Sequence, residues 1–167
     1  MRVLGLDPGL RVTGWGVVEA RAGRLRFVNC GIVRSSLDDP LPARLAALYD
    51  ALAAVIATYA PERAAVEETV VNSNPASSLK LGQARGVVLL AAARAGLEVA
   101  EYAARTIKRA VTGTGAATKD QVAAMVRHLL ADAREAPPDA TDALAVAICD
   151  AHHRATALRL AAAGLAP

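Results

Sequence analysis

The chain has 167 residues, of which 54% are hydrophobic and 21% are charged. This balance excludes intrinsic disorder, which requires low hydrophobicity and high net charge, and the length suits one domain with one core. A formal net charge of +3 is compatible with a polyanionic partner, although many basic proteins bind no nucleic acid.

Three strands are expected first, over residues 2–7, 12–20 and 25–33, with a turn at Gly23. The pattern then changes to helices that alternate with strands. The further expected elements are a helix over about 41–59, a strand over 63–67, a helix over about 76–94, a strand over 97–102, and helices beginning near Thr118 and Asp139. This order predicts an α/β fold with a mixed five-stranded sheet, an antiparallel N-terminal meander and flanking helices.

We expect one domain over residues 1–155 and an alanine-rich tail over residues 156–167 that either continues the last helix or frays. The longest uncharged apolar run, residues 86–93, is far shorter than the roughly 20 residues that span a bilayer. No signal-peptide apolar segment fits before Asp7, so we expect a cytoplasmic protein without a membrane segment. Cys30 and Cys149 lack paired spacing, which favours buried free thiols.

Two acidic residues end predicted strands. Asp7 precedes Pro8 and Gly9, and these residues alone are also typical of a simple Asp-Pro-Gly turn. Glu67 ends the fourth strand, where α/β sheets usually place ligands, although an exposed strand-end acid is also compatible with the pattern. Because side chains alternate along a strand, Glu68 is expected to point to the other face.

Asp139 and Asp142 are three residues apart at the start of the last helix, so they lie on one side of it. Acids at this position are also favoured by the helix dipole, and Asp139 behind two prolines suits an N-cap. Four carboxylates that meet at one sheet edge repel one another unless cations lie between them. Such a cluster suits two-metal phosphodiester hydrolysis with Mg²⁺ or Mn²⁺, which prefer carboxylate oxygen.

Four stretches of the chain carry a resemblance to a known family. They are GLDPGLRVTGWGVV (5–18), AVEETVVNSNPASSLKLGQARGVVL (65–89), EYAARTIKRAVTGTGAATKDQVAAMV (101–126) and DATDALAVAICDAH (139–152). Together they resemble the RuvC family of bacterial Holliday-junction resolvases, over roughly residues 1–153.

The resemblance implies a ribonuclease H-like fold and a homodimer that cuts a four-way DNA junction by two symmetric nicks, leaving 5′-phosphate and 3′-hydroxyl ends. It implies that Asp7, Glu67, Asp139 and Asp142 bind Mg²⁺, two ions per site, with Mn²⁺ able to substitute. The partners it implies are the RuvA junction-binding protein and the RuvB motor. The helix over about 76–94 is similar to the family's dimer helix, unless its run Val87 to Leu90 faces the domain's own core.

The resemblance also assigns basic residues. Lys108 and Lys119 would act in catalysis by screening the scissile phosphate, and both would bind DNA, whereas a lone surface lysine usually only aids solubility. Lys80, Arg11 and Arg85 are the further expected DNA-binding residues. His128, His152 and His153 show no metal-ligand spacing and receive no role.

One position departs from the family. Many members carry phenylalanine three residues after the glutamate, whereas this chain has Val70, which cannot stack on a base. We expect Val70→Phe to strengthen distortion of the junction, as measured by base fluorescence at the crossover.

Two other functions remain as alternatives. An Asp-x-Gly turn after a first strand also occurs in actin-like ATPases and sugar kinases, but those proteins need a second half and a second phosphate loop. A junction-binding module without catalysis is the other alternative, and it predicts that one of the four acids is missing, whereas all four are present.

Overall fold

The computed structural model describes residues 1–68 and 74–165. Its sheet has five strands in the order β3-β2-β1-β4-β5. They are β1 (Arg2–Asp7), β2 (Val12–Arg21), β3 (Arg24–Arg34), β4 (Arg63–Glu67) and β5 (Glu98–Tyr102). The first three pair antiparallel, whereas β1, β4 and β5 run parallel. The prediction of a mixed five-stranded sheet with an antiparallel meander is confirmed.

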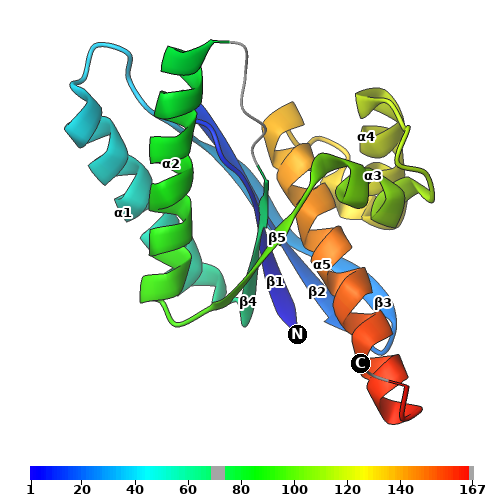
Figure 1. Cartoon of the computed structure of the whole chain (residues 1–167). Helices are drawn as coiled ribbons and strands as arrows, with labels where there is room; N and C mark the ends of the chain where they lie inside the picture. The colour runs from blue at the N-terminus through cyan, green and yellow to red at the C-terminus, as the bar shows by residue number, and fades with distance from the viewer. Residues whose placement is uncertain (69–73, 166–167) are drawn as a thin grey trace.

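Helices cover both faces of this sheet (Figure 1). One face carries α1 (Leu41–Tyr59) and α2 (Pro75–Arg94), and the other carries α3 (Ala104–Thr112), α4 (Lys119–Leu129) and α5 (Pro138–Ala162), with a 3-10 turn at Ala131–Ala133. Helix α3 is an element that the sequence analysis missed. Helix α5 runs across the expected boundary at residue 155, so most of the alanine-rich tail continues the last helix.

The alternation of side chains along the strands divides the core in two. Leu4 of β1 packs toward α1 and α2. Val3 of β1 and Ala65 of β4 belong to the core cluster that contains α5. Because residues two or four apart share a face, Asp7 and Glu67 also lie on the α5 side, at the carboxyl ends of two parallel strands.

Glycines in the sheet allow α5 to lie directly on the strands. A Cβ at Gly5 of β1 would lie 2.0 Å from the carbonyl oxygen of Ala143, and one at Gly14 of β2 would lie 2.0 Å from that of Asp139. Neither position has room for a methyl group. Since Gly14 is also the strand partner of Asp7, the backbone of α5 at Asp139 is fixed beside the end of β1.

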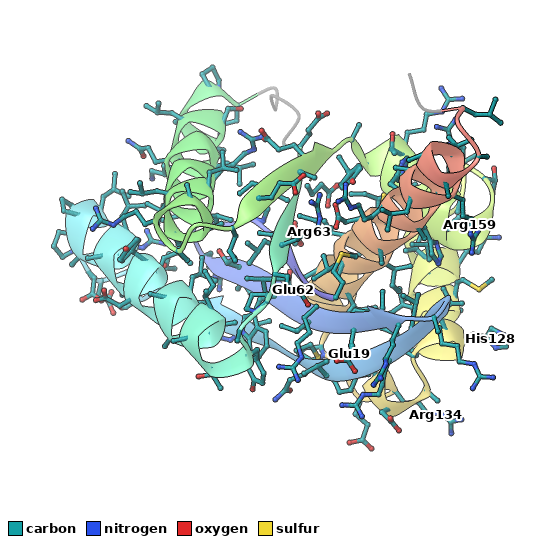
Figure 2. All side chains as sticks on the ribbon, turned by 90° about the horizontal axis from the view of Figure 1, so that it is seen from below. Glu19, Glu62, Arg63, His128, Arg134 and Arg159 are labelled. Atoms are coloured by element: carbon teal, nitrogen blue, oxygen red, sulfur yellow. The ribbon has the colours of Figure 1, made fainter. Side chains whose placement is uncertain are left out.

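A buried ionic network joins α5 to the parallel strands. Asp150 of α5 has no exposed surface and accepts hydrogen bonds from Nε and Nη2 of Arg63, at 3.1 and 3.2 Å. It also accepts one from the hydroxyl of Tyr102, at 2.9 Å, while Arg63 forms a second ion pair with Glu98. Figure 2 shows Arg63 at β4, on the side of the sheet where α5 lies. Because a buried charge is costly when unpaired, the network fixes how α5 sits on β4 and β5.

Two expectations about buried side chains hold only in part. Cys149 is buried, but Cys30 on β3 is partly exposed. Val88 of α2 packs into the domain's own core, whereas Leu90 is exposed. Part of the run that resembles a dimer helix is therefore core.

Among the described residues, α1 alone is long and apolar enough, by length and composition, to cross a membrane. The uncharged-run criterion missed it because Arg44 and Asp50 interrupt the helix. The core helix of a soluble protein passes the same test, and α1 buries Leu48 and Leu52 against the sheet. The match is weak support for a membrane segment.

Candidate active site

Asp7 leads into a tight, internally bonded turn. The backbone N–H of Gly9 donates to the hydroxyl oxygen of Thr13 at 3.3 Å, and that hydroxyl donates to the carbonyl of Gly9 at 2.7 Å. A Cβ at Gly9 would lie 2.2 Å from the carbonyl oxygen of Val12, so the close approach requires glycine. The Asp-Pro-Gly turn is therefore present, and it holds the carboxylate of Asp7 at the end of β1.

A cavity of about 330 Å³ opens where β1 and β4 end, between α3, α4 and α5. Apolar side chains of the three helices form part of its wall. Its charged lining brings together three of the predicted acids and both predicted catalytic lysines: Asp7, Glu67, Asp142, Lys108 and Lys119. Residues from five different elements meet here, as expected for strand ends and a helix start that share one sheet edge.

Asp139 stands slightly apart from the other acids. It does not line the cavity, yet its charge contributes to raising the pKa of Asp7. The expectation that Asp139 caps the helix is wrong, because the N-cap of α5 is Pro137 and no side chain caps it. The two prolines place the N-cap two residues earlier than the acid alone suggests.

The carboxylates destabilise one another's charged forms. Burial, followed by the charges of Glu67, Asp142 and Asp139, raises the pKa of Asp7 from 3.8 to about 7, against the opposing charge of Lys119. Burial and then the charge of Asp142 likewise raise the pKa of Glu67, while Lys119 and Lys108 oppose the rise. The two lysines therefore do not neutralise the cluster.

Lys119 is positioned by a helix cap. The backbone N–H of Thr118 donates to Oε1 of Gln121 at 2.9 Å, and the N–H of Gln121 donates to Oγ1 of Thr118 at 3.3 Å, which confirms the predicted capping box. Lys119 is the first residue of α4, and its Nζ lies 2.6 Å from Oδ2 of Asp142. This contact raises the pKa of Lys119.

The remaining predicted DNA-binding residues are differently placed. Arg11 is exposed in the loop after β1, and Lys80 is exposed in the first half of α2. Arg85 of α2 instead forms an ion pair with Glu101 of β5, so its guanidinium is already engaged inside the domain. Val70 lies outside the described residues.

None of the three histidines lines the cavity. His152 places Nδ1 3.0 Å from the carbonyl oxygen of Ala110, and the ring of His153 stacks on Tyr102 with centroids 5.2 Å apart. His128 is exposed at the end of α4. The sequence analysis did not predict the apolar wall of the cavity, which includes Ile107 and Val122. The helical spacing of these residues was the only signal available before the fold was known.

The cavity supplies the type of donor atom that a hard divalent cation prefers, but its side chains are not arranged as a metal site. All of its anionic groups are carboxylates, the oxygen ligands that Mg²⁺ and Mn²⁺ prefer. Within residues 1–68 and 74–165, however, no three acidic, histidine or cysteine side chains are already grouped as metal ligands. Asp142 instead contacts Nζ of Lys119 through Oδ2.

A mixed sheet with acids at the ends of β1 and β4 and on the adjoining helix defines the class of ribonuclease H-like nucleases. The family described as "Crossover junction endodeoxyribonuclease RuvC" matches residues 3–150. A protein of that name from Paramagnetospirillum magneticum is 58% identical over 163 residues, which cover 98% of each chain, and one from Rhodospirillum rubrum is 60% identical over 163 residues, which cover 98% of this chain and 96% of the relative. The chain belongs to the RuvC family.

Solved structures agree with this assignment. The RuvC of T. thermophilus in complex with a Holliday junction substrate superposes with a TM-score of 0.87 at 34% identity, covering 93% of this chain and 96% of that one. The yeast mitochondrial Holliday junction resolvase superposes with a TM-score of 0.67 at 12% identity, covering 95% of this chain and 82% of that one, and shows the shared fold alone. The predicted family and the ribonuclease H-like fold class are confirmed.

Proposed function

We propose that this chain is a crossover junction endodeoxyribonuclease that resolves four-way DNA junctions by paired symmetric nicks. The observation that carries the proposal is the group of mutually repelling carboxylates that surrounds Asp7 at the end of β1. Such a group is stable only when protonated or when cations join it, and phosphodiester hydrolysis at neutral pH uses the second condition. The family membership and the junction complex of the T. thermophilus relative support the choice of substrate.

The four acids Asp7, Glu67, Asp139 and Asp142 would hold the metal, which we propose to be Mg²⁺, two ions per site, with Mn²⁺ able to substitute. Bound there, the ions would lower the pKa of a water and stabilise the leaving 3′ oxygen, so that the nicks carry 5′-phosphate and 3′-hydroxyl ends.

The two lysines would serve the phosphate. Lys119 would exchange Asp142 for a phosphate oxygen when DNA enters, which frees that carboxylate for the metal. Lys108 would face the same phosphate from α3 and offset charge that develops in the transition state. Lys80 and Arg11 would contact the DNA backbone further out, and Arg85 would do so only after releasing Glu101.

We further propose a homodimer, because one junction requires two nicks. An exposed stripe along α2 contains small and apolar residues at helical spacing: Leu79, Gly82, Gly86 and Leu90. A Cβ at either glycine would meet nothing within 4 Å, so a second helix could approach closely. By family membership we also propose a cytoplasmic location and RuvA and RuvB as partners.

A gel assay with a synthetic mobile four-way junction tests this function. The protein is incubated with Mg²⁺ or Mn²⁺ beside Asp7→Asn and beside Asp120→Asn, a matched control at an exposed acid of α4. We expect paired nicks at symmetric positions from the wild type and the control, and a loss of about a thousandfold or more in Asp7→Asn. Junction binding should persist in that variant.

Other results would refute the proposal. Cleavage of linear duplex at the same rate as the junction would mean a nuclease without junction selectivity. Tight junction binding without cleavage under either metal would make the chain a binding module. Equal loss in both variants would mean that a general change in charge, rather than Asp7, is responsible.

A further inference from the structure

A second cavity lies at the opposite end of the molecule from the active site. Its volume is about 410 Å³, and it is formed by the β2–β3 turn and the C-terminal half of α5. Figure 1 shows both chain termini at this end. The strand β1 runs from Arg2 at this end to Asp7 at the other, a span of about 17 Å.

The wall of this cavity is strongly basic. It contains the four arginines Arg21, Arg24, Arg154 and Arg159, and no acidic residue lies among its lining side chains. Within the part of the chain that the structure describes, none of the four forms an ion pair. Arg154 lowers the pKa of Glu98, but that carboxylate is already bound to Arg63.

The β2–β3 turn holds two of these arginines in a costly arrangement. Arg21 and Arg24 are direct cross-strand partners, and like charges placed opposite each other destabilise a hairpin. Between them Ala22 has a φ of 49°, in the left-handed region that alanine rarely adopts. Among the described residues no acid pairs with either guanidinium, so no ion pair within the domain offsets this repulsion.

Exposed leucines accompany the charges. Leu25 and Leu158 line the cavity, and Leu158 is 56% exposed. Leu160 and Leu165 are further exposed leucines near the end of α5, although neither lines the cavity.

The combination of arginines and leucines discriminates between ligands. Guanidinium groups bind phosphate and carboxylate equally well, but a DNA backbone would leave the leucines exposed to water. A small free anion would not fill the cavity. We propose that this cavity, together with the neighbouring end of α5, binds an acidic segment of a partner protein that also carries leucines.

The test uses two labelled peptides and the full chain. One peptide is designed as a helix with glutamates on one face and leucines on the other, and the second has serine at every leucine. Fluorescence anisotropy measures their binding to the wild type, to Arg154→Glu/Arg159→Glu, and to the control Arg127→Glu/Arg134→Glu, which changes the net charge equally. Figure 2 shows Arg134 well apart from Arg159.

We expect the wild type and the control to bind the leucine peptide, and the Arg154→Glu/Arg159→Glu protein to bind it about tenfold or more weakly. The serine peptide should bind less tightly to the wild type. Cleavage of a four-way junction should be unchanged in both double variants, which separates this site from the nuclease.

Five results would overturn the proposal. The wild type does not bind the leucine peptide, or both double variants lose binding equally. Binding of the serine peptide as tightly as the leucine peptide would identify a site for anions. Displacement of the leucine peptide by a short DNA duplex, together with a fall in junction affinity only in Arg154→Glu/Arg159→Glu, would identify a site for DNA. A dimer that dissociates only in that variant would assign the surface to a second copy of the chain.

Discussion

Helix α5 carries two charged groups that differ in how their charges are balanced. Near its N-terminus, Asp142 joins Asp7 and Glu67 in a group that we call the carboxylate cluster. Two turns further on, Asp150 meets Arg63 and Tyr102 in a group that we call the arginine network. Both combine an acid of α5 with a charged side chain of β4, Glu67 in the carboxylate cluster and Arg63 in the arginine network.

The difference lies in where the countercharge comes from. In the arginine network, the chain itself supplies a bidentate guanidinium and a hydroxyl donor, so Asp150 is fully bonded. In the carboxylate cluster, Lys119 reaches only Asp142, and the charges of its neighbours raise the pKa of Asp7. A complete network holds structure, whereas an incomplete one leaves a place for an external cation.

Removing one side of the arginine network should have the largest effect on stability. We expect Asp150→Leu to lower the free energy of unfolding by about 3 to 5 kcal/mol, because Arg63 is left buried without its main partner. The double variant Arg63→Met/Asp150→Leu should recover most of the loss, since a matched apolar pair can replace a buried ion pair. Urea unfolding measures both; a double variant as unstable as the single would contradict this account.

The carboxylate cluster should make stability depend on pH in the opposite sense from an ordinary paired acid. The folded-state pKa of Asp7, about 7, is above the ordinary value of 3.8, so the fold disfavours the charged form. Without metal, the stability contributed by protonated Asp7 is complete below about pH 4 and is lost as the pH rises through 7.

Melting temperatures in EDTA between pH 4 and 8 measure this effect. Asp7→Asn should flatten the fall, and Mg²⁺ should raise the melting temperature of the wild type more at pH 8 than at pH 5. Asp120→Asn, at an exposed acid outside the cavity, should retain the wild-type profile. A fall that is equally steep in Asp7→Asn would place its origin elsewhere.

The smallest effect on stability is expected at the contact between the lysine and the cluster. Lys119→Met should change the free energy of unfolding by less than about 1 kcal/mol, because Lys119 is 68% exposed and its ion pair is screened by solvent. Junction cleavage should nevertheless fall, by about tenfold or more. Thermal unfolding and the gel assay separate the two readouts, with Arg134→Met as a matched loss of positive charge.

Local patterns predicted most of the fold. The expected strand ends brought Asp7 and Glu67 to one sheet edge, and the capping box at Thr118 located the start of the helix that carries Lys119. The choice of the acids as metal ligands came from the family resemblance. Helix α3 was missed because its N-cap is Ala103, which provides no start signal. The cap of α5 was misplaced because two prolines and an acid allow several starts.

Long-range ionic contacts had no local signal. Arg63 and Asp150 are 87 residues apart, and their pairing depends on how α5 crosses β4. Arg85 was expected at the DNA because it lies in a motif stretch, yet the approach of α2 to β5 brings Glu101 to it. A charged side chain can be recognised from sequence, but its partner is determined by the packing of distant elements.

The bare backbone at Gly5 and Gly14 has a consequence for how this enzyme could be inactivated. The helix that carries Asp139 and Asp142 rests on two strands with no side chain between them. A single methyl group at either glycine would act as a wedge and lift two proposed metal ligands away from Asp7. An unbiased screen for inactive variants should therefore return uncharged substitutions at these two glycines of the sheet, although neither carries a reactive side chain.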